Sequence, residues 1–395
     1  MTQPDASRLP SGSRLSDSAR RQALEQFLNP QSPVANVVGF GHGVKWTDHG
    51  PTGEPALLVF VTQKMPSMFL DEADLLPART EDGTLVDVVS VGQVMAQPLP
   101  LTPVEEAVTD LLEDAARSRQ QRAAADLLED ATRARQLGQL GQHGAVLPSA
   151  LGAQALTRRM RPCPAGFSIG NVAITAGTLG SVVYDFLPGA TIDPPSSGIG
   201  TPSTYYVLSN NHVLAASNSA SLGSAIVQPG RFDGGVDPQD RIATLSRFVP
   251  IQFAPAVPLD RQNNVVDCAV AACQFQDATR EIYFNGAPRG WRRKANVQVG
   301  DLVRKTGRTT NTTFGRIIST TATVDVGYGP AGTARFHDQI VTTNISAGGD
   351  SGSLVTSYDN VAIGLLFAGS SISTIVNHFE TVRAMLRIEI AEQLM

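Results

Sequence analysis

The pattern of apolar and polar positions changes character twice before residue 161. Residues 1–32 are polar with scattered Ser, Pro and Arg, which predicts a disordered or weakly helical arm. Three β-rich runs follow, separated by turn signals and the short helical stretch DEADLL. The runs begin at Val34 (VANVVGFGHGVKW), Ala56 (ALLVFVTQKMP) and Thr84 (TLVDVVSVGQV). They predict a small α/β domain over residues 33–100.

Residues 101–160 have a different pattern, with helix-forming residues and an internal near repeat. DLLEDAARSRQ at 110–120 returns as DLLEDATRARQ at 126–136, a period of 16 residues. On one continuous helix this period rotates the Leu pairs by roughly 160°, to opposite sides. A continuous helix would therefore need two partners, and a break near Gln121 would give a helical hairpin. The segment is predicted to be a helical linker, and both simple linkage and a homo-oligomer formed through the repeat remain open.

From residue 161 short β-rich runs alternate with turns rich in Gly, Pro, Asn and Asp. Examples are TYYVLSNNHVLA, VVDCAVAAC and VAIGLLFAGSS. They form two groups of about six, which predicts two tandem six-stranded β-barrels over about 161–285 and 286–380. The closing FETVRAMLRIEIAEQL has helical periodicity and is expected to cap the second barrel. The predicted fold class is therefore mainly β.

Composition agrees with a turn-rich β protein and excludes several classes of partner. The 395 residues include 36 Gly and 25 Pro, and 17% are charged. The net charge is −5 and the densest basic cluster is only Arg292, Arg293 and Lys294, so we expect no nucleic-acid partner. No apolar stretch is long enough for a signal sequence or a membrane span, and we expect a soluble, cytoplasmic protein without a membrane partner.

The cysteines and short motifs give no sign of a cofactor. Three cysteines, Cys163, Cys268 and Cys273, leave one unpaired in any arrangement, so we expect reduced thiols. The sequence has no CxxC pair, no HExxH and no Walker-type loop. We therefore expect neither a metal nor a cofactor.

Three separated segments carry candidate chemistry. GGDSGSLV, at 348–355, holds Ser351 between glycines, which allow backbone N–H groups to point at one oxygen. A serine needs a base and a third group that orients the base. His212 ends the strand YYVLSNN, and Asp267 stands in the apolar NNVVDCAVAAC, where burial requires a partner. Taken singly, each has a structural explanation: a hairpin turn, a strand-end histidine or a turn-capping aspartate.

Taken together, these segments resemble the trypsin-like (chymotrypsin-clan) serine peptidases of the bacterial type without disulfides. The chain order His, Asp, Ser, with GDSGS around the serine, is typical of this clan, and other triad families use other orders. GDLVRKTGRTT and GLLFAGS are similar to supporting segments of the second barrel, and the resemblance covers about 165–390. LLFAGSS behind an extra N-terminal domain also resembles the plant Narrow leaf type.

The resemblance implies a role for each residue. Ser351 would attack the scissile carbonyl, His212 would accept and return the proton, and Asp267 would orient the imidazole. The backbone N–H groups of Gly349 and Ser351 would form the oxyanion hole. The chain is thus expected to be a serine endopeptidase acting on a protein or peptide substrate. A catalytically silent trypsin-like fold used for binding, and an esterase with the same acyl chemistry, are the alternatives.

The resemblance also implies a substrate pocket. Aligned from the serine, Ile345 falls at the pocket floor, followed by Ser346, with Ala368 and Gly369 on the flanking strand. An apolar floor cannot balance an Arg or Lys head group, so we expect an apolar or small residue at P1. Leu366 stands where glutamate-specific relatives have a histidine, so we do not expect selectivity for an acidic P1 residue.

Two departures from digestive trypsins bear on regulation. No Ile-Val-Gly-Gly cleavage site precedes the first strand, so Asp350 must find a partner other than a new N-terminus or face solvent. A folded segment before the peptidase suggests control, and one hypothesis is that residues 34–100 dock over the cleft or the oxyanion loop and hold the enzyme inactive.

Overall fold

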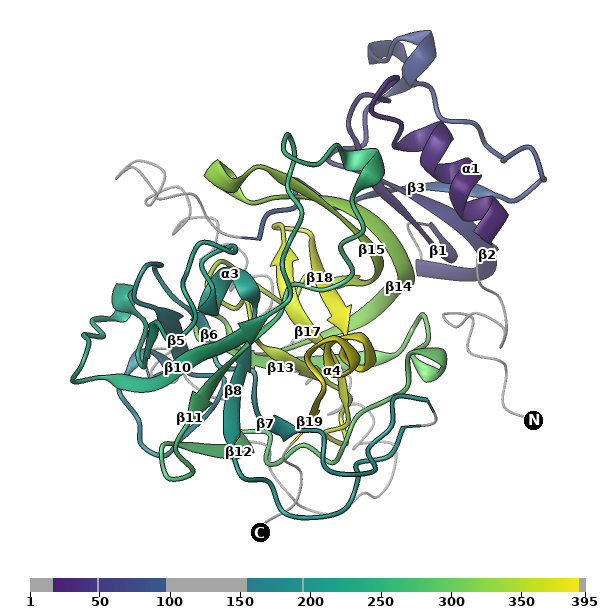
Figure 1. Cartoon of the computed structure of the whole chain (residues 1–395). Helices are drawn as coiled ribbons and strands as arrows, with labels where there is room; N and C mark the ends of the chain where they lie inside the picture. The colour runs from purple at the N-terminus through teal and green to yellow at the C-terminus, as the bar shows by residue number, and fades with distance from the viewer. Residues whose placement is uncertain (1–16, 48–49, 97–154, 194, 391–395) are drawn as a thin grey trace, which may run out of the picture.

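The structure is a computed structural model that describes residues 17–47, 50–96, 155–193 and 195–390. Its strands form two large curled sheets, which confirms the predicted mainly β fold (Figure 1). The predicted helical repeat at 103–140 lies outside the described residues, as does most of the predicted N-terminal arm.

The first barrel is an eight-stranded sheet in the order β19-β7-β8-β11-β10-β9-β5-β6. The strands are β5 (Ser168–Asn171), β6 (Gly177–Thr178), β7 (Ser181–Asp185), β8 (Tyr205–Ser209), β9 (Ala225–Val227), β10 (Arg241–Phe248), β11 (Ala269–Cys273) and β19 (Ile388–Ile390). Leu179 N–H bonds to Phe167 O and Gly180 N–H bonds to Leu208 O. Because these bonds link both neighbours, β6 and β7 act as one bent strand that closes the ring.

The second barrel closes through a hairpin. Its six strands are β13 (Leu302–Gly307), β14 (Asn311–Gly327), β15 (Thr333–Thr343), β16 (Leu354–Thr356), β17 (Ala362–Gly369) and β18 (Ser373–His378). Their order is β13-β16-β17-β18-β15-β14, and the pairing of β13 with β14 completes the ring. The two predicted groups of strands therefore correspond to two barrels.

The predicted N-terminal α/β segment continues the sheet of the second barrel. β1 (Val37–Thr47), β2 (Gly50–Val61) and β3 (Val86–Ser90) extend it beyond β14, and Gly39 lies opposite Val324 (Figure 1). A Cβ at Gly39 would lie 2.5 Å from Thr323 O, so this close pairing needs glycine. Residues on both sides of the junction share one buried apolar cluster, which includes Phe60 and Phe336. The boundary drawn at residue 100 stays a prediction.

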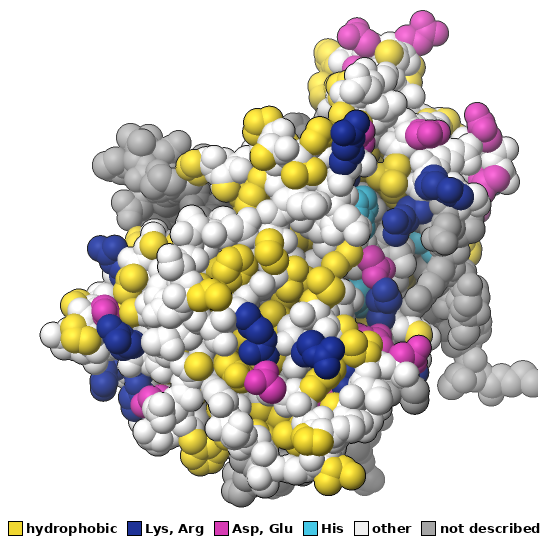
Figure 2. All heavy atoms as spheres, in the orientation of Figure 1, with side chains coloured by type: hydrophobic (Ala, Val, Ile, Leu, Met, Phe, Trp, Pro, Cys, Tyr) yellow, Lys and Arg dark blue, Asp and Glu magenta, His cyan; other side chains and the backbone are white. Residues whose placement is uncertain are grey.

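Part of the predicted arm is packed. Residues Asp17–Phe27 form α1, and Ala23 and Phe27 are buried in a cluster with Phe40 and Val59 of β1 and β2. The sequence suggested little packing because few large apolar residues are present, but the few that exist fall on one helical face. Many of the acidic side chains visible in Figure 2 gather at the upper right, where Figure 1 shows α1 and β1–β3.

The remaining elements are short. They are β4 (Cys163–Ala165), β12 (Ala278–Ile282), α3 (Asn211–Leu214), α4 (Phe379–Leu386) and the 3₁₀ turns η1 (Ser67–Phe69), η2 (Glu72–Asp74), η4 (Arg231–Asp233), η5 (Leu259–Arg261), η6 (Lys294–Asn296) and η7 (Gly329–Ala331). α4 was expected to cap the second barrel. It packs against β17 and β18 of that barrel, and its buried Phe379 and Val382 lie in the apolar cluster that also contains the core of the first barrel. β19 after it pairs with β7 of the first barrel.

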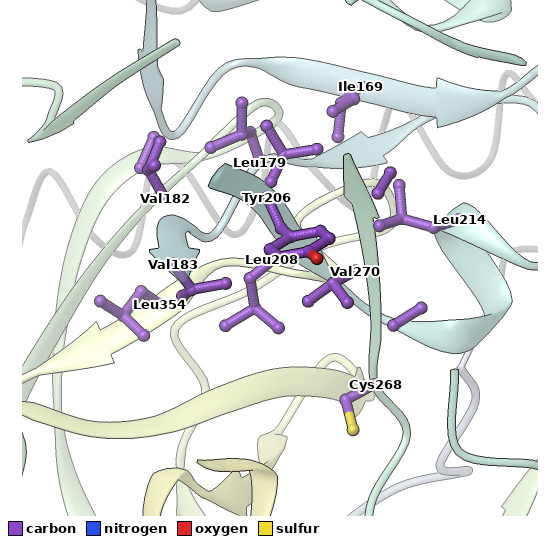
Figure 3. Close-up of a cluster of buried hydrophobic side chains, with 14 of the residues drawn as sticks. Ile169, Leu179, Val182, Val183, Tyr206, Leu208, Leu214, Cys268, Val270 and Leu354 are labelled. Atoms are coloured by element: carbon purple, nitrogen blue, oxygen red, sulfur yellow. The ribbon is translucent and has the colours of Figure 1, made fainter. Parts of the chain in front are cut away.

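The core of the first barrel supports the site. Leu179, Tyr206, Leu208 and Val270 converge inside the ring, as Figure 3 shows, and Leu354 of the second barrel lies in the same cluster. Because this apolar packing spans both barrels, it holds the two halves in a fixed relation. The loops that carry the candidate residues meet where the halves join.

Candidate active site

His212 and Asp267 form a buried pair. His212 lies in α3, the single helical turn that follows β8, and Asp267 lies just before β11. His212 Nδ1 is 2.6 Å from Asp267 Oδ2, and the two residues are 1% and 0% exposed. A hydrogen bond this short at Nδ1 fixes the ring orientation and leaves Nε2 as the nitrogen that can exchange protons with a substrate or nucleophile.

The Asp267 carboxylate has two further donors. The His212 backbone N–H donates to Oδ1 at 3.2 Å, and the Tyr328 hydroxyl donates to Oδ2 at 2.8 Å. Burial, and then the negative charge of Asp267, raise the pKa of Tyr328 well above its usual range, so the phenol stays a donor. Asp267 N–H itself donates to Asn377 Oδ1 at 3.0 Å. The bonds from the His212 ring, the His212 N–H and the Tyr328 hydroxyl compensate the cost of burying the carboxylate.

The Ser351 loop is shaped by two glycines with positive φ. Gly349 and Gly352 have φ of 92° and 97°, which side chains with a Cβ rarely adopt. Thr178 N–H donates to Ser351 O at 2.7 Å, and Gly352 N–H donates to Leu366 O at 2.8 Å. Among the described residues, no acceptor bonds the backbone N–H of Gly349 or Ser351. The two amides predicted to form the oxyanion hole thus have no hydrogen-bond acceptor within the described part of the chain, and their role stays a prediction.

The helix of His212 and the loop of Ser351 meet at Gly177. A Cβ built on Gly177 would lie 2.5 Å from Val213 Cγ2 and 3.1 Å from Ser351 O. Glycine is therefore required where the two segments converge. The geometry brings the three predicted triad residues to one junction between the barrels.

Ser351 Oγ bonds to carbonyl oxygens. It lies 3.2 Å from Ala96 O and 3.4 Å from Phe367 O, and the residue is 8% exposed. Because a hydroxyl has one proton to donate, this proton points to a carbonyl and not to His212 in this structure. Ala96 belongs to the segment after β3, so the N-terminal part of the chain covers the serine.

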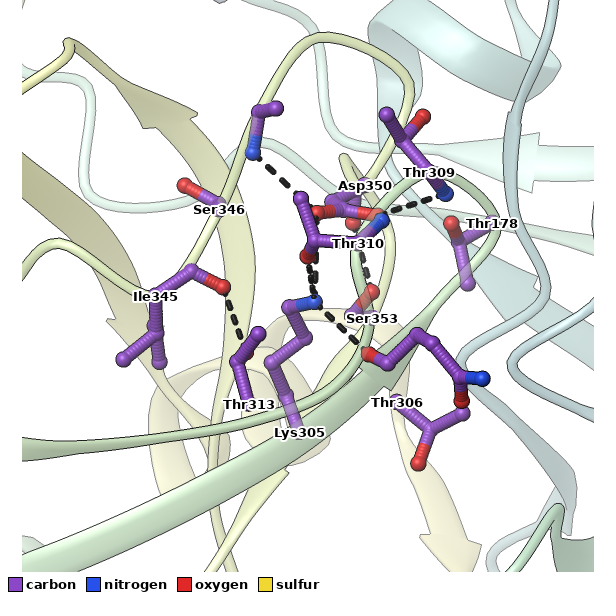
Figure 4. Close-up of polar contacts among 12 residues, drawn as sticks. Thr178, Lys305, Thr306, Thr309, Thr310, Thr313, Ile345, Ser346, Asp350 and Ser353 are labelled. Carbon is purple, nitrogen blue, oxygen red and sulfur yellow. Dashed lines mark hydrogen bonds and ion pairs between the residues drawn. The ribbon is translucent and has the colours of Figure 1, made fainter. Parts of the chain in front are cut away.

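Asp350 is paired with Lys305, a partner that the sequence analysis did not identify. Lys305 Nζ is 3.1 Å from Asp350 Oδ2, and both side chains are fully buried (Figure 4). The carboxylate also accepts the N–H groups of Thr309 at 2.9 Å and Ala347 at 3.1 Å. Burial lowers the pKa of Lys305, and Asp350 opposes that shift. An internal lysine thus fixes the aspartate next to Ser351.

The predicted pocket residues separate into two groups. Ile345 is fully buried among apolar side chains inside the second barrel, such as Ile317. Ser346 points the other way: its Oγ is 2.7 Å from Thr374 Oγ1, and a Cβ on Gly369 would lie 3.0 Å from it. Successive side chains of an extended segment face opposite sides, so Ser346 and Ile345 cannot both line the pocket. The structure does not place Ile345 at a pocket floor.

Ala368 lies with neither group. It is 2% exposed and belongs to the apolar cluster shared with β2 and with the segment that contains Val94. Hydroxyls of Ser346 and Thr374 therefore border the site near Gly369, where an apolar floor was expected.

Lys305, Tyr328 and Thr374 escaped the sequence analysis. A signal existed for Lys305 because strand alternation places it on the same face as the buried Val303. A lysine on a buried face needs a buried acid. Tyr328 and Thr374 gave no comparable signal, since nothing in their local sequence indicates what they contact.

Other chemistry was searched within the described residues. No three His, Cys, Asp or Glu side chains gather there as metal ligands, and no helix there has the length and apolarity to cross a membrane. Cys163, Cys268 and Cys273 are free thiols. Burial raises the pKa of Cys273 to about 12.

Comparisons with known proteins give likeness in structure only. No protein-family model matches the chain, and no curated protein matches it. Solved structures that resemble it are Thermobifida fusca protease A (14% identity, 58% of this chain and 98% of that chain, TM-score 0.39) and Cellulomonas bogoriensis chymotrypsin (16%, 58% and 98%, 0.38). A glutamic acid-specific serine protease is also similar (18%, 57% and 99%, 0.37).

The neighbours are bacterial serine proteases, and at such low identities and TM-scores the likeness says nothing about the activity of this chain. The nearer resemblance to the plant Narrow leaf type finds no support among them.

Proposed function

We propose that this chain is a serine endopeptidase that uses Ser351, His212 and Asp267. The observation that carries the proposal is the buried 2.6 Å pair of His212 and Asp267 beside the Gly177 junction, where the Ser351 loop arrives. A histidine held by a carboxylate, next to a serine in a cradle of free amides, is the arrangement that acyl transfer requires.

In the proposed reaction, Ser351 Oγ attacks the scissile carbonyl while its proton passes to His212 Nε2. The imidazolium forms beside the Asp267 carboxylate, which stabilises it, and it then protonates the leaving amine. Water then attacks the acyl-enzyme while His212 Nε2 takes its proton, and the imidazolium returns that proton to Ser351 Oγ as the carboxylic acid product leaves. Each step needs the His212 Nδ1–H to point at Asp267, and Asp267 Oδ2 is placed to accept a hydrogen bond from this N–H.

The oxyanion that forms during attack would be held by the N–H groups of Gly349 and Ser351. Each such donor is typically worth about 2.7–4 kcal/mol in the transition state. The positive φ of Gly349 and the buried pair of Asp350 with Lys305 support a cradle that is formed before substrate arrives. We propose a small or apolar P1 residue, because Ser346 and Thr374 bring hydroxyls but no ionised group to this side of the site.

We further propose that the N-terminal part of the chain regulates the enzyme. The contact of Ala96 O with Ser351 Oγ supports this, since substrate could not reach the hydroxyl past it. Two expectations remain proposals: a cytoplasmic location, with which three free thiols agree, and a homo-oligomer formed through residues 103–140.

A peptide-library digest tests the activity. Wild type and Ser351→Ala are incubated with the library, and mass spectrometry identifies new peptide ends. We expect cleavage after small or apolar residues by wild type and none by Ser351→Ala. Equal cleavage by both proteins would exclude Ser351 as the nucleophile, and binding without cleavage would favour the silent binding module.

A further inference from the structure

We propose that residues 91–96 form an inhibitory strand that occupies the substrate-binding edge of β17, so that a substrate must displace it as an extended chain. This inference rests on the proposed peptidase function and specifies how the same site is controlled. Four features support it: the open edge of β17, the pairing of the segment, its burial and the direction of the Ser351 proton.

The edge of β17 is open beyond the point where β16 ends. β16 pairs with β17 as far as Leu354 opposite Leu365. Further along the same strand, Phe367 O lies 3.4 Å from Ser351 Oγ, and Gly369 lies beyond the last residue of β17 that pairs with β16. An extended peptide that adds to this edge passes directly by Ser351, as in recognition by strand addition.

Residues 94–96 already occupy this edge. Met95 N–H donates to Gly369 O and Gly369 N–H donates to Met95 O, each at 3.0 Å, which is an antiparallel bridge. On the other side, Ala96 N–H donates to Gly327 O and Gly327 N–H donates to Val94 O, also at 3.0 Å. The segment thus fills a slot between the ends of β17 and β14.

The segment is anchored by burial as well as by its backbone. Val91, Val94 and Ala96 are 1%, 3% and 3% exposed, whereas Gln93 between them is exposed. Ser373 Oγ donates to Val91 O at 2.9 Å. A competing chain must therefore present small or apolar residues at the positions of Val94 and Ala96, which defines the class of substrate that fits.

The contact with Ser351 blocks catalysis. Attack on a carbonyl needs the hydroxyl proton on the His212 side and the carbonyl oxygen in the cradle of backbone amides. Here the Ser351 hydroxyl lies within hydrogen-bond distance of Ala96 O and Phe367 O, so its proton is directed at one of these carbonyl oxygens. The arrangement therefore inhibits and does not present the Ala96 carbonyl for cleavage.

An inhibitory strand in the same chain competes at high effective concentration. Because its binding is intramolecular, a peptide in dilute solution must bind more tightly than the strand does in order to displace it. The observed activity then falls by the fraction of molecules in which the strand has left the slot. Loosening the strand should raise activity and leave the catalytic residues unchanged.

A matched pair of variants tests this. Ala96→Asp puts a carboxylate into the buried slot, and Gln93→Asp adds the same charge at an exposed position three residues away. The substrate is a peptide that the library digest has identified. On this peptide we expect Ala96→Asp to raise kcat/KM by about tenfold or more. Gln93→Asp should stay within about twofold of wild type. Folded Ala96→Asp protein with wild-type activity would overturn the inhibitory role. So would a fragment that begins at Gln97 and forms in wild type but not in Ser351→Ala, because the enzyme would then cleave the segment as a substrate.

Hydrogen exchange provides a test that does not need activity. In the full-length Ser351→Ala protein, the Met95, Ala96 and Gly369 amides should exchange at least about tenfold more slowly than the exposed Gln93 amide. Met95 exchange as fast as that of Gln93 would overturn the strand pairing itself. Absence of cleavage by every variant, with Met95 protected, would instead overturn the peptidase function and with it the inhibitory role.

Discussion

Lys305 Nζ lies 3.1 Å from Asp350 Oδ2, and neither side chain has any exposed surface. The ammonium comes from a strand of the second barrel, and the carboxylate belongs to the residue before Ser351. Folding alone therefore delivers the cation that orders this loop. The loop therefore has an ordering cation without proteolytic production of a new N-terminus, which agrees with the missing Ile-Val-Gly-Gly signal.

Replacing Lys305 by Met should destabilise the protein. The substitution leaves the Asp350 carboxylate buried without its cation, which typically costs about 3–5 kcal/mol of unfolding free energy. Urea denaturation of wild type and Lys305→Met measures the loss. The double variant Lys305→Met, Asp350→Asn removes both charges and should recover part of the stability. A single variant as stable as wild type would contradict the importance of the pair.

The same pair predicts an alkaline limb in the pH profile. Burial lowers the pKa of Lys305 below its usual 10.5. Between the folded pKa and 10.5 the unfolded chain binds more protons, so this group alone contributes stability that rises with pH. Activity should fall in that window, because neutral Lys305 no longer balances Asp350. Lys305→Arg stays charged and should extend activity to higher pH. Coincident profiles would contradict this assignment.

Tyr328→Phe should weaken catalysis without abolishing it. The substitution removes one hydrogen bond to the Asp267 carboxylate, and such bonds to charged groups are worth about 1.5–3 kcal/mol. We expect kcat/KM to fall by at least about tenfold, mostly through kcat. Steady-state kinetics on a library peptide measures the change. A fall confined to KM would indicate that Tyr328 binds substrate and does not position Asp267.

Asp267→Asn should be far more damaging. An amide can accept at one end and donate at the other, so it favours the wrong tautomer of His212. The expected loss in kcat is roughly 10⁴-fold, with little change in the position of the ring. A rate that stays within tenfold of wild type would show that Asp267 does not orient the histidine.

Much of the site could be predicted from local sequence. Alternating apolar runs indicated two groups of strands, and GDSGS, His212 and Asp267 occurred in an order that points to one chemistry. These signals are local because glycine dihedrals and a buried carboxylate each impose requirements on their immediate neighbours.

The remainder depended on contacts between distant segments. Pairing of β1 with β14 joins Gly39 to Val324, and no local pattern encodes such a partner. The same holds for Met95 against Gly369. Ile345, expected at the pocket floor, is buried in the apolar cluster of the second barrel, because a shift of one residue along an extended segment moves a side chain from one face to the other.

Labelling with a fluorophosphonate probe tests the central claim most directly, because only an activated serine reacts with it. Wild type, Ala96→Asp, His212→Ala and Ser351→Ala are treated, and the adduct is located by mass spectrometry. The account predicts an adduct on Ser351 in wild type, faster labelling in Ala96→Asp, and none in the other two. Labelling of Ser351 at the same rate in His212→Ala, or no adduct in any of the four proteins, would contradict it.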